Sequence, residues 1–192
     1  MDTSTAPSWS LRLTSELDAA DARATAIVGA LTTHQLNWKP SADVWSVGQC
    51  LEHLCISNEV YMQPIADALR AMPTRPVNEI TLGWISRWFI RRYIEPTSQK
   101  TRARAPRKAM PIGSRIDRSI LERFIASNAK VRAVIAAAHS HDINRVRFRN
   151  PFVPGVRFTV GAGLQIIARH NHRHLLQAER VTQSPRFPRD ES

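Results

Sequence analysis

The sequence predicts an all-α fold, specifically a four-helix bundle with a long basic connection between the second and third helices. Four stretches carry apolar residues at steps of three and four, which is the spacing of an amphipathic helix. Strand signals are confined to two short alternating stretches, residues 146–148 and 156–158. Residues 79–113 are rich in tryptophan and arginine and are too long for a compact bundle, so we expect a basic insertion there.

Length and charge narrow the classes of protein to consider. The chain has 192 residues and a formal net charge of +11, with 27 Lys and Arg against 16 Asp and Glu. A chain of this length builds one sizeable core. We therefore expect a single domain over residues 1–183 and a flexible tail over residues 184–192. The positive charge attracts polyanions non-specifically, but it does not by itself indicate a function.

Cysteine usage and hydropathy bear on location. Cys50 and Cys55 are the only cysteines, which is too few for a disulfide scaffold, and their spacing is not that of a CxxC pair. The first ten residues lack the basic and apolar regions of a signal peptide, and no window of about 18 apolar residues occurs. We therefore expect a cytoplasmic protein with no membrane span.

The first two helices are separated by a loop. Residues 11–31 show the first helical pattern, and a proline at position 40 ends it within a loop that runs to about residue 45. Ser46 and Gln49 have the spacing of a capping box at the start of the second helix, and Trp45 and Cys50 have that of a hydrophobic staple. Pro64 is expected to kink or divide this helix.

The insertion has two parts. Residues 79–93 are periodic, with tryptophans interleaved with arginines, which suits either a short helix that covers the bundle or a helix that lies on a membrane surface. Residues 96–113 contain prolines and basic residues but no acidic residue, so no packed element is expected there. The insertion can cover the mouth of a site, supply basic residues for an anionic thiol or substrate, or do neither.

The second half of the chain supplies the remaining two helices. Residues 116–138 show the third long helical pattern, and Thr159 is the expected N-cap of a fourth helix that runs to about Val181. His139 and His141 lie near the end of the third helix, where a cation complements the helix dipole. We interpret these two histidines as capping residues.

Three histidines are candidate metal ligands. His170 and His174 are one turn apart on the last helix, and Gln177 follows one turn later on the same apolar face. His172 points the opposite way and is expected to be exposed. Two imidazoles hold an ion weakly, so a third ligand is needed, and His53 lies on the inward face of the second helix. Three such ligands leave coordination positions open for water or substrate.

An alternative explanation needs no metal. A buried histidine is satisfied by hydrogen bonds alone, although three inward imidazoles then require many partners. Gln177 either supports a ligand from outside the coordination shell or hydrogen-bonds elsewhere. No general base can be named, because Glu52 and Glu59 flank His53 at angles that point toward solvent or a neighbouring helix.

Short motifs along the chain resemble the DinB-like superfamily, also called the DinB/YfiT-type metalloenzymes. The matching segments are NWKP at 37–40, WSVGQCLEHL at 45–54, NPF at 150–152 and HNHRHLLQ at 170–177. The resemblance spans about residues 10–181. It implies a four-helix bundle whose metal ligands fall on His53, His170 and His174, the histidines that helical spacing also selects.

The resemblance also suggests a chemistry. Similar proteins include transferases that use bacillithiol or other low-molecular-weight thiols and a mycothiol-dependent maleylpyruvate isomerase. The first hypothesis is therefore a thiol-dependent transferase or a hydrolase that uses a divalent zinc, nickel, iron or manganese ion, with a small-molecule substrate or thiol as its partner. A metal lowers the pKa of a bound thiol and makes the nucleophilic thiolate available.

Two other hypotheses remain. One is a non-catalytic metal-binding or stress-related module with a basic surface. The other is nucleic-acid binding, but no helix-turn-helix, RNP or zinc-finger pattern accompanies the charge, so we expect no specific nucleic-acid partner. The basic residues in question are Lys100, Arg102, Arg104, Arg107, Lys108 and those within residues 87–92. Bundles of this kind often pair through helix faces, so a homodimer is also considered.

Overall fold

A computed structural model describes residues 6–70, 75–95, 105–113 and 115–189 of the chain. Lys100, Arg102 and Arg104 of the predicted basic insertion lie outside the described residues. The elements, in chain order, are α1 (Ser8–Gly29), α2 (Thr33–Asn37), α3 (Val47–Arg70), α4 (Trp84–Phe89), the π-helical turn η1 (Ile90–Ile94), the 3-10 turn η2 (Arg107–Ala109), α5 (Ile120–Ala137), the 3-10 turn η3 (Ala138–Ser140), β1 (Arg147–Arg149), β2 (Arg157–Thr159) and α6 (Val160–Thr182).

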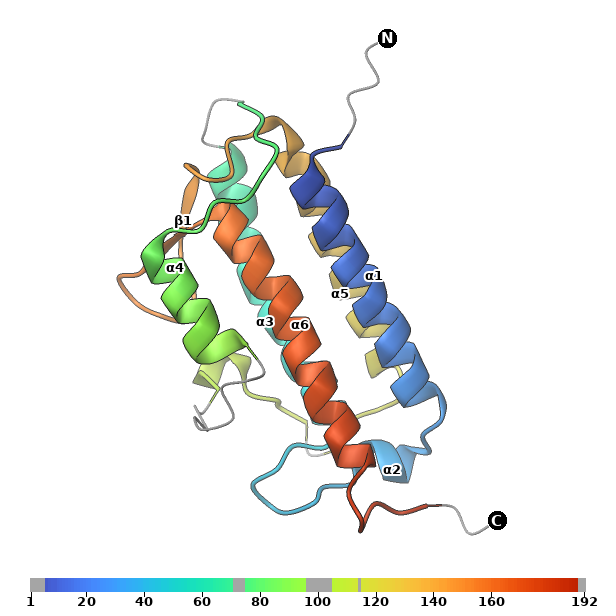
Figure 1. Cartoon of the computed structure of the whole chain (residues 1–192). Coiled ribbons are helices and arrows are strands. Elements are labelled where there is room, and N and C mark those ends of the chain that lie inside the picture. The colour runs from blue at the N-terminus through green and yellow to red at the C-terminus, as the bar shows by residue number, and fades with distance from the viewer. Residues whose placement is uncertain (1–5, 71–74, 96–104, 114, 190–192) are drawn as a thin grey trace.

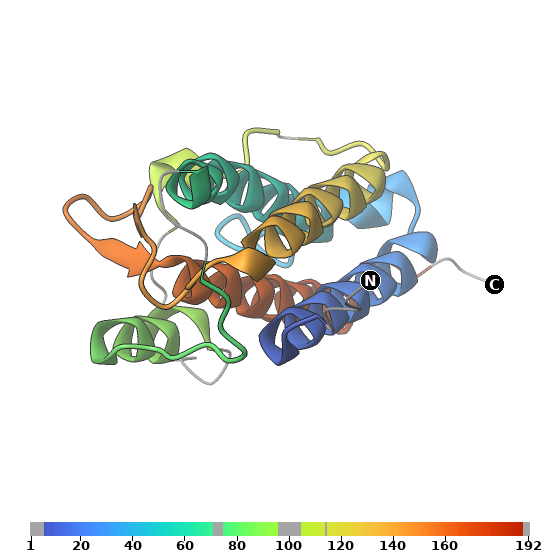
Figure 2. The ribbon, with the colours of Figure 1, turned by 90° about the horizontal axis from the view of Figure 1, so that it is seen from above.

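The prediction of an all-α fold is confirmed. The long helices α1, α3, α5 and α6 lie side by side (Figure 1), and seen from above each of them has two main neighbours (Figure 2). Helix α3 packs against α5 and α6, and α1 packs against the same two helices from the other side. The described sheet consists of β1 and β2 alone, an antiparallel hairpin close to the expected strand signals.

Local signals set several helix ends. Ser46 and Gln49 form the predicted capping box, with each backbone N–H donating to the other side chain at 3.2 Å. The side chain of Thr159 accepts from the backbone N–H of Ala162, so this N-cap is also confirmed. Pro64 lies inside a continuous α3 and does not divide it.

The short helix α2 was not predicted. It occupies part of the segment that the apolar pattern assigned to a connecting loop, because five residues are too few to show a helical period. Its own capping box is formed by Thr32 and Gln35. Such a box holds a single helical turn in place where periodicity gives no signal.

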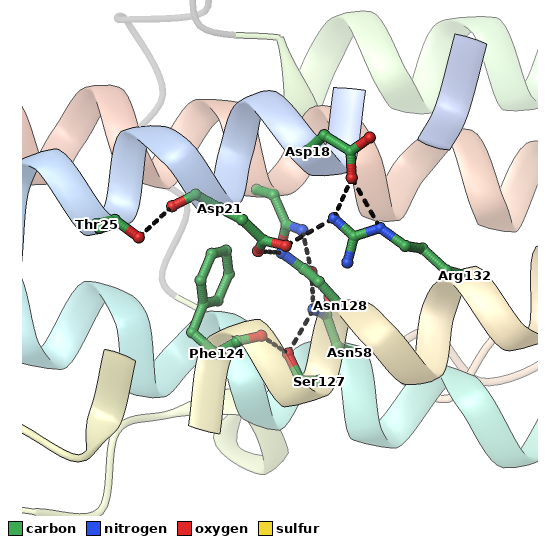
Figure 3. Close-up of polar contacts among 9 residues, drawn as sticks. Asp18, Asp21, Thr25, Asn58, Phe124, Ser127, Asn128 and Arg132 are labelled. Carbon is green, nitrogen blue, oxygen red and sulfur yellow. Dashed lines mark hydrogen bonds and ion pairs between the residues drawn. The ribbon is translucent and has the colours of Figure 1, made fainter. Parts of the chain in front are cut away.

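A buried polar layer crosses the bundle. The Oδ1 atom of Asn128 accepts from the Nδ2 atoms of Asn58 at 3.0 Å and Asn171 at 2.8 Å. Asn128 in turn donates to Asp21 at 2.7 Å, and Arg132 pairs with Asp21 at 2.6 Å (Figure 3). These residues come from α1, α3, α5 and α6. Buried amides are satisfied only when these partners meet, so the layer fixes the helices relative to one another.

The hairpin has an apolar inner face. Phe148 and Phe158 are cross-strand partners and both are buried. Phe148 packs so closely on α6 that a Cβ atom built on Gly163 would lie 2.6 Å from its ring. Glycine at this position therefore allows the hairpin to approach the helix.

The segment formed by α4 and η1 covers one flank of α6 (Figures 1 and 2). Ile90 and Ile94 are buried in the core. Arg173 of α6 donates to the carbonyl oxygen of Tyr93 at 2.8 Å, and Arg169 pairs with Glu95 at 2.9 Å. One side of the segment therefore covers the bundle, which is one of the two interpretations of its periodicity.

Two other segments pack more than expected. Ala109, within the stretch where no packed element was predicted, is only 1% exposed, because the backbone here passes directly over α3. In the predicted flexible tail, Phe187 packs edge-on against Trp38 at a ring distance of 5.4 Å, and Gln35 donates to the carbonyl of Pro188 at 2.9 Å. Ring packing in the tail and backbone hydrogen bonds in both stretches anchor them, even though their composition is mainly polar. Within the described residues, no helix has the length and hydropathy needed to cross a membrane.

Candidate metal centre

The three histidines predicted as ligands meet between α3 and α6. His53 belongs to α3, and His170 and His174 face it from successive turns of α6. The Nε2 atoms of His53 and His170 are 3.2 Å apart, and the three residues each offer one nitrogen within 4.8 Å of the others. Their ring centroids are separated by 4.5 to 4.9 Å. The structure thus brings together the residues that helical spacing selected.

Hydrogen bonds orient two of the rings. The Nδ1 atom of His53 lies 2.6 Å from the carbonyl oxygen of Ala109, and that of His174 lies 2.9 Å from Oε1 of Gln177. Since both partners only accept, each Nδ1 carries the proton and donates it. The Nε2 atoms of these two rings are then unprotonated lone-pair donors, which is the form a metal requires.

The donor set fits a divalent ion. Two imidazole nitrogens that bind one tetrahedral zinc at about 2.0 to 2.1 Å are about 3.3 Å apart. The 3.2 Å between Nε2 of His53 and Nε2 of His170 is close to that value. Imidazole is a good ligand for zinc, nickel and iron, so the cluster can hold such an ion with positions left for water or substrate.

Burial keeps the imidazoles neutral. Desolvation lowers the pKa of His53 from its ordinary value and places the pKa values of His170 and His174 well below it. Repulsion from neighbouring histidines and from the positive charge of Arg173 lowers the pKa values of His170 and His174 further. Because protons and metal ions compete for the same lone pairs, this environment favours metal binding at neutral pH.

An aromatic ring and a cation border the cluster. The half-buried Trp45 lies 4.8 Å from the ring of His53 and 5.8 Å from that of His174, measured between centroids. Arg173 donates to the backbone carbonyls of Tyr93 and Glu95, and among the described residues it pairs with no carboxylate. The site therefore has one apolar wall and a nearby uncompensated positive charge.

Acidic and thiol side chains are engaged elsewhere. Glu52 accepts from the backbone N–H groups of Ile112 and Gly113, and Glu59 pairs with Arg123 at 3.0 Å. Cys50 and Cys55 are buried, and desolvation raises the pKa of each thiol to about 12, so neither is a thiolate at neutral pH. Within the described part of the chain, the ligand cluster is made of histidine alone.

The remaining histidines have other surroundings. His172 is exposed, as expected. His139 lies in the last turn of η3 and His141 is its C-cap residue, at the helix end where both were predicted. In addition, the Nε2 atom of His139 lies 2.5 Å from the hydroxyl of Ser10, and its ring packs edge-on against Trp9. This residue therefore joins η3 to α1. The spacing along its own helix carried no information about that partner.

Comparison with protein families agrees with this geometry. A family model described as the DinB superfamily matches residues 16–178. The chain belongs to the DinB superfamily. Neither curated proteins nor solved structures gave a significant match.

For this DinB superfamily chain, sequence analysis missed some groups around the site. The carbonyl of Ala109 has no sequence signal, because any residue supplies one. Trp45 was interpreted only as half of a hydrophobic staple, although it lies eight residues before His53 and its ring packs beside the histidine cluster. Arg173 lies between two predicted ligands, and its unmatched charge becomes visible only when the positions of the acidic residues are known.

Proposed function

We propose that the chain is a metal-dependent enzyme in which His53, His170 and His174 hold a divalent ion. The observation that carries the proposal is the convergence of three neutral imidazoles from two helices on one point. A closed structural site uses four protein ligands, whereas three leave room for a reactant. Membership of the DinB superfamily is compatible with this role.

Among enzyme classes, we favour a transferase that uses a low-molecular-weight thiol, with a hydrolase as the second possibility. A divalent ion in such a site lowers the pKa of a bound thiol, so that thiolate forms at neutral pH. Hydrolysis commonly also requires a general base to handle the water proton. Glu52 and Glu59 are engaged away from the cluster, which favours the thiol over water as the nucleophile.

The chain's own residues have distinct tasks in this proposal. Gln177 and the carbonyl of Ala109 hold His174 and His53 with Nε2 toward the ion. Trp45 shields one side of the cluster from water. Arg173 provides a positive charge that attracts a carboxylate or phosphate on the incoming thiol or substrate.

The first test is elemental analysis of untagged protein. Wild type is expected to bind about one equivalent of a transition metal, and His53→Ala, His170→Ala and His174→Ala are each expected to lose it while they keep their helicity. The matched control is His172→Ala, which removes an exposed histidine from the same helix and should leave the metal content unchanged. Retention of the metal in the three cluster variants would contradict the assignment.

The second test separates catalysis from metal binding alone. The metal-loaded protein is mixed with a panel of low-molecular-weight thiols and an electrophile, and thiol consumption is followed with wild type and with His170→Ala. Metal-dependent transfer supports the enzyme. A metal-loaded protein that is inactive with every thiol, and whose metal spectrum no thiol changes, favours the non-catalytic metal-binding module instead.

A further inference from the structure

The outward side of α4 exposes three large apolar side chains, which a surface helix normally turns inward. Trp84, Ile85 and Trp88 are 75%, 47% and 55% exposed, while the opposite side of the segment contributes Ser86 and Ile90 to the interior. Two exposed tryptophans one turn apart, next to an exposed isoleucine, have no role in covering the bundle. A contiguous apolar surface of this kind marks an interaction site.

Positive charge lies beside these rings. Arg87 and Arg91 are both exposed on the same short segment. Between Trp84 and Ile94 the sequence contains no acidic residue. Glu95, which follows directly, is already paired with Arg169 at 2.9 Å. The surface that α4 presents is therefore both aromatic and cationic.

The neighbouring hairpin extends the positive charge. Arg149 and Arg157 stand directly opposite each other on the exposed face of the two strands, and Arg147 lies on the same face. Like charges in this position destabilise a hairpin. None of the three arginines has a carboxylate partner in the described part of the chain. An anion bound from outside the chain would relieve this repulsion.

The hairpin lies beside this helix. Phe89 of α4 packs against Phe158 of β2 with their ring centroids 5.1 Å apart, and the hairpin and α4 are neighbours in both views (Figures 1 and 2). We call the exposed side chains of these two adjacent elements the Trp–Arg face. Its members are Trp84, Ile85, Arg87, Trp88 and Arg91 of the α4–η1 segment and Arg147, Arg149 and Arg157 of the hairpin.

We propose that the Trp–Arg face binds the headgroup region of an anionic lipid bilayer. Tryptophan is enriched at the membrane–water interface, where its ring is in an apolar layer and its N–H group stays near water. Arginines next to the rings contact lipid phosphates, and each basic side chain near an anionic surface strengthens binding. A short helix with these residues lies in the plane of the interface and does not cross it.

The shape and charge of the face favour this occupant over two others. Single-stranded nucleic acid is bound in positively charged grooves whose aromatic residues stack on the bases. Here the tryptophans project from the convex side of a helix next to an aliphatic side chain. A second copy of the chain would present the same cationic face, and each copy carries a net charge of +11, which opposes self-association.

The test is co-sedimentation of the full chain with vesicles of phosphatidylcholine alone or mixed with phosphatidylglycerol. Wild type is expected to bind the mixed vesicles and to shift its tryptophan emission to shorter wavelength. Arg87→Gln combined with Arg91→Gln is expected to weaken binding to mixed vesicles about thirty-fold. Trp84→Ser combined with Trp88→Ser should lower binding at least as much and abolish the emission shift.

Matched controls lie elsewhere on the surface. Arg115→Gln combined with Arg118→Gln removes the same charge from two exposed arginines outside the Trp–Arg face, and Ile112→Ser removes an apolar side chain that is 87% exposed. Both variants should bind the mixed vesicles nearly as wild type does. All substituted positions are exposed, so the fold is expected to persist, and circular dichroism checks this.

Three results would overturn the proposal. The first is an equal loss of vesicle binding in the control and test variants, which would show that binding depends only on net charge. The second is stronger binding to a single-stranded oligonucleotide than to mixed vesicles, with the Trp–Arg variants impaired for the oligonucleotide. The third is a dimer in light scattering that the tryptophan substitutions dissociate, with no binding to vesicles by wild type.

Discussion

Acidification is expected to destabilise the metal-free protein, because unfolding releases imidazoles that the fold keeps neutral. The pKa values of His170 and His174 lie well below the ordinary value of histidine. Below about pH 6.5 the unfolded chain therefore binds more protons than the folded chain does. The free energy of unfolding should fall as the pH drops through this value, until the folded imidazoles also become protonated.

The size of the effect follows from linkage. An imidazole that is neutral in the folded state and has a pKa of about 6.5 in the unfolded state contributes about 1.4 kcal/mol between about pH 7.5 and about pH 5.5. His170 and His174 together should account for about 3 kcal/mol. That is a large share of the roughly 5 to 15 kcal/mol that stabilises a typical domain.

Urea denaturation of chelator-treated protein at the two pH values measures this difference. His170→Gln removes one of the two imidazoles. Its unfolding free energy should therefore fall by about 1.4 kcal/mol less than that of wild type between the two pH values. His172→Gln is the matched control, because it removes an exposed histidine from the same helix and leaves the cluster intact. The reasoning fails if His170→Gln and wild type lose the same stability on acidification.

Three further changes test other parts of the structure. Replacement of Gln177 by leucine should lower metal affinity about ten- to hundred-fold in calorimetric titration, because the Nδ1 atom of His174 loses its acceptor. Asn128→Ala should destabilise the fold by at least about 3 kcal/mol in urea, because two buried asparagine amides lose their acceptor. Gly163→Ala should lower the melting temperature and cost about 1 to 3 kcal/mol, because its Cβ atom would overlap the ring of Phe148; an unchanged melting temperature would show that the hairpin moves freely.

The parts of the structure that sequence predicts well are those whose signals are local. The capping box of Ser46 and Gln49 lies within one turn, and the inward direction of His170 and His174 follows from the period of a single helix. The pairing of His53 with them required only that two apolar faces meet. Short-range geometry was therefore enough to predict both the helix starts and the histidine cluster.

The parts that were missed depend on contacts between distant segments. Asn58, Asn128 and Asn171 come from three helices, and a lone buried amide has no periodic signature. The partner of His139 is Ser10, which is 129 residues away in the chain. Burial of Ala109 could not be read from a basic, proline-rich composition, because the backbone and not the side chain makes the contact.

The contact between His53 and the carbonyl of Ala109 has a consequence for how the site tolerates sequence change. Every amino acid carries a backbone carbonyl, so any residue small enough for the buried position can orient this imidazole. The tautomer of His53 is thus set by where the backbone passes, and not by a particular side chain.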